Sequence, residues 1–310
     1  MRPRVEVTII LPLPAKLYLD PIKCHILFLS IPHELYCCLI PTTFPNTAQV
    51  VSPFQAILDY ELERGIPPGW VNTCISHNKP YGYWHRLERG EVLLDSTWFA
   101  GFSSDFNAPS LWESFYSKAR AKDPSLPSTL PPLPQIDGEK LFWTMMSMAR
   151  THDPWVFPAL QKLKASGRYI LAALSNTVIY PPGHRWSNAH DEVRALFDIF
   201  ISSAHVGMRK PDPIIYEYAV RVLDRFAKEN AGAAERKTQG WEDGVKANEI
   251  VFLDDIGENL KAAKKMGFGT IKVDLGKAFE AVDQLEDLTG LELAGTHPRV
   301  AVKPNARARL

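Results

Sequence analysis

Three stretches of the sequence carry polar or charged groups of the kinds that bind phosphate and divalent cations. Each of the three comes soon after a short apolar run. They are Ser175-Asn176-Thr177, the stretch Gly207-Met208-Arg209-Lys210-Pro211-Asp212-Pro213, and Asp254-Asp255. In an open α/β sheet, ligands bind beyond the carboxyl ends of the strands. If the apolar runs are strands, a hydroxyl, an ammonium group and a carboxylate pair meet at one edge of the sheet.

Together these groups predict a magnesium-assisted phosphate site. The Ser175 hydroxyl and nearby backbone N–H groups would bind phosphate oxygens, and Lys210 would neutralise their charge as a compact cation. Asp254 and Asp255 supply the hard oxygen ligands that Mg²⁺ prefers, directly or through water. We therefore expect Mg²⁺ as the cofactor and Asp254 and Asp255 as its ligands.

Each of these features also has a plain structural interpretation when it is taken alone. Ser175 could simply end a buried strand, and Lys210 could be a surface lysine before a helix. One of the two aspartates could cap the helix that follows. However, adjacent carboxylates repel each other and need a cation or several donors nearby. The occurrence of all three features on successive strand ends favours a binding site.

The pattern of apolar residues predicts the elements that would position these groups. Short apolar runs without alternation are interleaved with helical segments, which indicates a parallel sheet covered on both faces. These runs span 169–174, 199–203, 250–253 and 270–273. Upstream, residues 52–157 look mostly helical, beginning with the capping signal Ser52-Pro53. We expect an α/β protein with a Rossmann-like parallel-sheet core and a helical cap.

Composition narrows the class of protein. The chain has 310 residues, enough for about two domains, and 35 basic residues balance 35 acidic ones. Zero net charge argues against bulk nucleic-acid binding, and no apolar run is long enough to span a bilayer. The four cysteines form no metal-binding or disulfide pattern, which favours a reducing compartment. We expect a cytoplasmic protein that acts on a small-molecule substrate, with no nucleic-acid or membrane partner; the sequence leaves its oligomeric state open.

The three motifs resemble motifs II, III and IV of the haloacid dehalogenase (HAD) superfamily. They are Leu174-Ser175-Asn176, Lys210-Pro211-Asp212-Pro213-Ile214-Ile215-Tyr216 and Phe252-Leu253-Asp254-Asp255-Ile256-Gly257-Glu258-Asn259. The chain is most similar to the helical-cap subfamily. Residues 52–72 and 82–91 resemble the HAD domain at the N-terminus of soluble epoxide hydrolases and of an acyl-CoA dehydrogenase family member. Members of this kind are typically Mg²⁺-dependent phosphatases.

The resemblance implies a role for each matching residue. Ser175 would hydrogen-bond the transferring phosphoryl group, and Lys210 would stabilise the nucleophile and the covalent intermediate. Asp254 and Asp255 would hold Mg²⁺. Asn176 and Asn259 would line or brace the site.

One motif of the family is missing from the sequence. The family's nucleophile is an Asp at the end of the first strand, just before the cap, and residues 42–49 contain no Asp and no Gly. Asp20 is too far upstream, and Asp59 lies inside a helix. Two explanations remain open: a non-native start that has replaced the first strand, or a HAD-fold protein that binds phosphate or metal without catalysis. Without the carboxylate, nucleophilic catalysis has no route.

These observations give the expected organisation. Residues 1–49 should be an irregular segment that supplies no central strand, 50–157 a helical cap, 158–290 the HAD core and 291–310 a mobile tail. We expect a HAD-like hydrolase of the phosphatase type acting on a small organophosphate, impaired as written; the alternative is a non-catalytic binding or regulatory protein. A receiver domain is set aside because its acid pair comes first in the chain. A dinucleotide-binding oxidoreductase is set aside because no Gly-x-Gly-x-x-Gly turn follows a strand.

Overall fold

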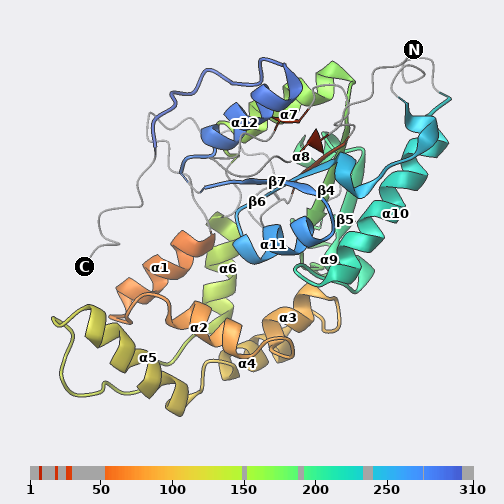
Figure 1. The fold of residues 1–310 in the computed structure, drawn as a ribbon. Helices are drawn as coiled ribbons and strands as arrows, with labels where there is room; N and C mark the ends of the chain where they lie inside the picture. The colour runs from red at the N-terminus through yellow and green to blue at the C-terminus, as the bar shows by residue number, and fades with distance from the viewer. Residues whose placement is uncertain are drawn as a thin grey trace.

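A computed structural model describes most of the chain. The described residues are 7–8, 18–19, 26–29, 53–148, 152–187, 192–232, 240–274 and 276–301. Figure 1 shows two parts, a sheet flanked by helices and, below it, a group of helices.

A five-stranded parallel sheet forms the core of the upper part. Its strand order is β5-β4-β3-β6-β7, and every neighbouring pair is parallel. The strands are β3 (Ile26–Leu29), β4 (Ile170–Ser175), β5 (Ile199–Ser202), β6 (Ile250–Asp254) and β7 (Gly269–Lys272). Two-residue strands β1 (Val7–Thr8) and β2 (Tyr18–Leu19) form a separate antiparallel pair. The α/β class and the parallel sheet predicted from the apolar runs are confirmed.

Helices cover both faces of the sheet, which explains why its central strands are mostly apolar. All residues of β4 and β6 are buried, and alternate residues of each enter two separate apolar clusters. One cluster contains α7 (Val156–Ser166) and α12 (Phe279–Thr289); the other contains α10 (Pro213–Asn230) and α11 (Gly257–Lys265). Short helices α8 (Glu192–Ala195) and α9 (Ser203–Val206), with 3₁₀ turns Trp241–Asp243 and Ala247–Glu249, complete this part.

The lower part is an all-helical cap with its own apolar core. Its helices are α1 (Pro53–Glu63), α2 (Trp70–His77), α3 (Tyr83–Glu88), α4 (Ser96–Ser104), α5 (Pro109–Lys122) and α6 (Gly138–Met148). The cap core contains four buried tryptophans: Trp70, Trp84, Trp98 and Trp112. Val178 and Trp186, from the loop after β4, also pack into this cluster and so tie the cap to the sheet. The exact boundaries of the predicted domains stay predictions.

The N-terminal segment differs from expectation at its centre. We expected residues 1–49 to supply no central strand, and this is wrong for Ile26–Leu29, which pairs with both β4 and β6. The run Ile-Leu-Phe-Leu is apolar on both sides, as a strand between two buried neighbours must be. It is too short for periodicity to identify it among prolines. Of residues 1–49, only 7–8, 18–19 and 26–29 are described.

The C-terminal segment also differs from expectation. Residues 291–301, expected to belong to a mobile tail, pack against the core. Leu293 is fully buried, and the Glu286 carboxylate accepts hydrogen bonds from the backbone N–H groups of Leu293 and Ala294. The Trp155 indole N–H donates to the Pro298 carbonyl. The rest of the expected tail, 302–310, lies outside the described residues. No helix within the described part of the chain is long and apolar enough to cross a membrane.

Candidate functional site

A buried ion pair lies at the carboxyl edge of the sheet. The Lys210 Nζ and Asp254 Oδ2 atoms are 3.0 Å apart, and the two residues are 2% and 1% exposed. Asp254 is the last residue of β6, and Lys210 precedes α10, whose first turn is capped by Asp212 with Pro213 at its start. The positions of these two motifs after predicted strands indicated that they would lie at one edge of the sheet. In the structure their side chains are in contact.

Asp254 is held by neutral donors as well as by the lysine. The Asn259 side-chain amide lies 3.2 Å and 3.0 Å from the two Asp254 carboxylate oxygens, and the Ile256 N–H donates to Oδ1 at 2.7 Å. Behind Asn259, the buried Tyr216 hydroxyl donates to the Asn259 carbonyl at 3.0 Å. The bracing role expected of Asn259 therefore has a geometric basis. Tyr216 received no site role from the sequence, although it ends the second of the three motifs.

Asn176 fixes the backbone of Lys210. Its side-chain oxygen accepts the Lys210 N–H at 2.8 Å, and its amide nitrogen donates to the Lys210 carbonyl at 3.1 Å. This reciprocal pair joins the end of β4 to the segment before α10. In this structure, Asn176 positions the lysine through its main chain.

Ser175 and Thr177 lie in a group of buried hydroxyls. Ser175 is completely buried at the end of β4, and its hydroxyl lies 3.5 Å from the Asn176 carbonyl. The Thr177 hydroxyl lies 2.5 Å from that of Ser202, which in turn lies 2.6 Å from Nδ1 of His205. Thr177 was part of the predicted motif, whereas neither Ser202 nor His205 was predicted for the site. Ser202 lies within the second predicted strand and His205 lies two residues after it.

Asp255 gives the site its second carboxylate. It is half-buried, and burial together with the charge of Asp254 raises the pKa of Asp255 to about 6, while the Lys210 cation acts in the opposite direction. A cation beside the two carboxylates would relieve this repulsion. Mg²⁺ is commonly held by one or two carboxylates, with waters and substrate phosphate completing its shell. The donor set therefore fits Mg²⁺, although the described residues contain no cluster of three or more His, Cys, Asp or Glu side chains suited to a metal.

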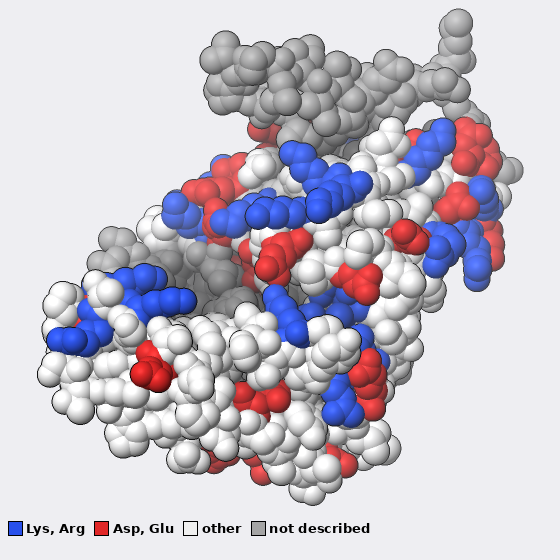
Figure 2. Space-filling view, turned by 60° about the horizontal axis from the view of Figure 1, so that its bottom comes forward, with Lys and Arg blue, Asp and Glu red and all other residues white. Residues whose placement is uncertain are grey.

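The cap reaches this edge through charged groups. Arg209 donates from Nε to Glu88 of α3 at 2.6 Å, and Lys79 pairs with Glu258 at 3.0 Å. Figure 2 shows acidic and basic side chains intermixed where the upper and lower parts of the molecule meet. His85 of α3 is only 1% exposed. These contacts join residues 121 and 179 positions apart, so no local pattern could have found them.

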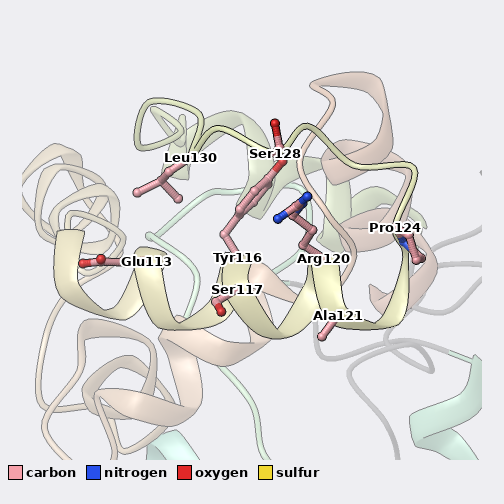
Figure 3. Close-up of a pocket in the computed structure, with 8 residues that line it drawn as sticks. All are labelled: Glu113, Tyr116, Ser117, Arg120, Ala121, Pro124, Ser128 and Leu130. Carbon is pink, nitrogen blue, oxygen red and sulfur yellow. The ribbon is translucent and has the colours of Figure 1, made fainter.

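A separate hollow lies on the outer side of the cap. It has a volume of about 360 Å³ and is lined by residues of α5 and of the segment 124–130. Figure 3 shows the side chains of Tyr116 and Arg120 extending from α5 toward the loop that carries Ser128. None of the residues predicted for the phosphate site lines this hollow.

Comparison with known proteins gives sequence relatives but no family profile that matches the chain. It is 35% identical over 247 residues to bifunctional epoxide hydrolase 2 of Mus musculus, which covers 79% of this chain and 37% of that protein. It is 25% identical over 247 residues to acyl-CoA dehydrogenase family member 10 of Mus musculus, covering 79% of this chain and 18% of that protein. The chain thus spans well under half the length of these curated relatives.

The solved structures that the comparison matches include a HAD family enzyme from Bacteroides thetaiotaomicron in complex with magnesium and inorganic phosphate. It is 16% identical in sequence, with a TM-score of 0.39, and the match covers 83% of this chain and 97% of the other.

Proposed function

We propose, because the chain belongs to the haloacid dehalogenase-like hydrolase superfamily, that its candidate site is a Mg²⁺-dependent phosphate site of the phosphatase type. The substrate class would be a small phosphate monoester. The observation that carries the proposal is the buried contact between Lys210 and Asp254 at the carboxyl edge of the sheet, with Asp255 directly beside it.

The described residues divide the work of binding between them. Asp254 and Asp255 would hold Mg²⁺, which when bound neutralises phosphate charge and polarises phosphoryl oxygens. Lys210, fixed through its backbone by Asn176, would donate to a phosphate oxygen as a point charge. Asn259 keeps both oxygens of Asp254 oriented. Ser175, buried at the end of β4, is the proposed hydroxyl partner of the phosphate.

We expect the unmodified chain to bind phosphate but to hydrolyse phosphate esters very slowly. The described strand β3 consists of Ile26, Leu27, Phe28 and Leu29, none of them acidic, and Ser30 is the next residue in the sequence. A covalent mechanism loses most of its rate without its nucleophile. This observation keeps the second candidate function, a non-catalytic phosphate- or metal-binding protein on the same fold.

Calorimetric titration with Mg²⁺ and then inorganic phosphate tests the binding proposal. Asp254→Asn should weaken Mg²⁺ binding by at least about tenfold, as expected when a metal ligand or the residue that orients it is changed. The matched control is Asp224→Asn, which alters an aspartate on α10 that pairs with Lys228. No Mg²⁺ binding by the unmodified chain, or equal affinity in both variants, would contradict the site.

Hydrolysis of p-nitrophenyl phosphate tests the catalytic part. We expect little turnover by the unmodified chain and Mg²⁺-dependent turnover when residues 1–49 are replaced with a strand ending in Asp-x-Gly-Gly before Val50. A point variant, Ser30→Asp, with Ser30→Asn as its neutral control, asks whether one carboxylate after β3 is sufficient. Full activity of the unmodified chain, abolished by Lys210→Ala, would mean that another group acts as nucleophile. Inactivity of every variant would favour the non-catalytic function.

A further inference from the structure

Within the described part of the chain, two ion pairs join the cap to the core, and each involves a residue directly before a residue of the proposed site. Glu88 of α3 pairs with Arg209, which precedes Lys210. Lys79 pairs with Glu258, which precedes Asn259. The cap therefore contacts the core one residue away from the phosphate-binding lysine and from the brace of Asp254.

The two pairs differ in burial. The side chains of Glu88 and Arg209 are 4% and 17% exposed, whereas those of Lys79 and Glu258 are 40% and 63% exposed. Exposed pairs contribute little because water and salt screen them. Removing one partner of a buried pair leaves an uncompensated charge and is strongly unfavourable. The Glu88–Arg209 contact is therefore the one able to hold a backbone segment in place.

Packing around this pair leaves little room for movement. At Gly90, directly after α3, an added Cβ would lie 2.1 Å from the carbonyl oxygen of Ala204 in α9. His85 lies one turn before Glu88 and is buried; its Nδ1 has no hydrogen-bond partner among the described residues. Burial and the nearby Arg209 charge lower the pKa of His85 to about 4, so it is neutral near pH 7 and does not compete with Arg209 for Glu88.

The loop after β4 also holds this segment. The Thr177 N–H donates to the Ser203 hydroxyl at 2.8 Å, and Asn176 binds both backbone groups of Lys210. Residues of the segment 203–210 thus contact both the β4 loop and the cap. On the cap side, the Glu88–Arg209 ion pair and the close approach of Gly90 to Ala204 contact this segment.

We propose that Glu88 is a positioning residue for the phosphate site: through Arg209 it fixes the segment that carries Lys210, so that docking of the cap completes the site. The proposal rests on the proposed function because it takes Lys210 as the phosphate-binding cation. Glu88 itself touches neither metal nor phosphate in this scheme.

Hydrogen exchange of the full chain, without added ligand, tests the coupling itself. In Glu88→Ala, amides in the peptide 207–212 should exchange about tenfold faster, since local opening no longer breaks a hydrogen bond between charged groups. Glu88→Gln, which keeps an acceptor oxygen, should give a smaller increase and serves if the alanine variant does not fold. Lys79→Gln breaks the exposed cap-to-core pair and should leave this peptide unchanged. Equal exchange in the wild type and both Glu88 variants would overturn the proposal.

Phosphate titration in the presence of Mg²⁺ separates a positioning role from a merely structural one. Glu88→Gln should raise the Kd for inorganic phosphate by about tenfold, at the low end of losses seen when a residue that orients ligands is changed. In a Lys210→Met background the same change should have no further effect, because its route runs through the lysine. An equal loss in both backgrounds would overturn the proposal. A wild type that binds no phosphate, with faster exchange of 207–212 in the Glu88 variants, would contradict the proposed function while supporting the coupling.

Discussion

Replacing Lys210 by methionine should destabilise the folded protein by about 3 kcal/mol. Breaking a buried ion pair by removing one partner typically costs roughly 3–5 kcal/mol. Here the stranded Asp254 keeps the donors of Asn259 and of the Ile256 N–H, which places the cost at the low end of that range. The methionine also keeps an unbranched apolar chain beside the Phe252 ring, whose centroid lies 5.5 Å from Lys210 Nζ.

The double variant Lys210→Met/Asp254→Asn tests whether the unpaired charge of Asp254 causes the loss of stability in Lys210→Met. With no charge left in the buried position, about half of the lost stability should return, although each single change removes the same ion pair. Urea unfolding gives both values, from a lower midpoint at an unchanged m-value. A loss below about 1 kcal/mol in the single variant, or a double variant that loses the full sum of two single losses, would refute the reasoning.

Three further predictions concern the cap and the termini. Burial raises the pKa of Glu61 to about 7 despite hydrogen bonds from backbone N–H groups, so its stabilising contribution is full below pH 4.5 and is lost as pH rises through 7. Relative to Glu61→Gln, the wild type should therefore lose about 3 kcal/mol between pH 4 and pH 8 in urea unfolding; parallel curves would contradict this. Gly90→Ala should lower the melting temperature far more than Gly167→Ala, since both have positive φ but only Gly90 lacks space for a Cβ; equal shifts would mean that the cap does not approach Ala204. Leu293→Ala should cost about 2–3 kcal/mol in chemical unfolding because it leaves a cavity in the core, and no loss would restore the view of a free tail.

The sequence was sufficient where one local signal determined the element. The apolar runs before Asn176 and Asp255 became β4 and β6, because a strand buried on both faces must be apolar at successive positions. The Asp212-Pro213 start of α10 followed from capping chemistry. The contact between Lys210 and Asp254 could be expected because parallel strands end at the same edge.

The sequence was insufficient where long-range packing decided the outcome. The strand Ile26–Leu29 shows no hydrophobic periodicity and no capping signal. Its position is determined by pairing with two apolar strands that come much later in the chain. Burial of Leu293 depends on Glu286, which accepts two backbone N–H groups across a turn of chain. The Glu88–Arg209 pair joins the cap to the core across 121 residues.

Hydrogen bonds from outside the first strand hold the two charged groups of the candidate site. Asp254 and Lys210 form an ion pair. Asn259 donates a hydrogen bond to Asp254, and Asn176 accepts one from the Lys210 backbone N–H. Binding of Mg²⁺ or phosphate would draw on these same groups, whereas turnover would also need a carboxylate that none of the four residues of β3 supplies. We therefore expect ligand binding to be separable from catalysis in this chain, and a measured rate of ester hydrolysis would distinguish the two candidate functions.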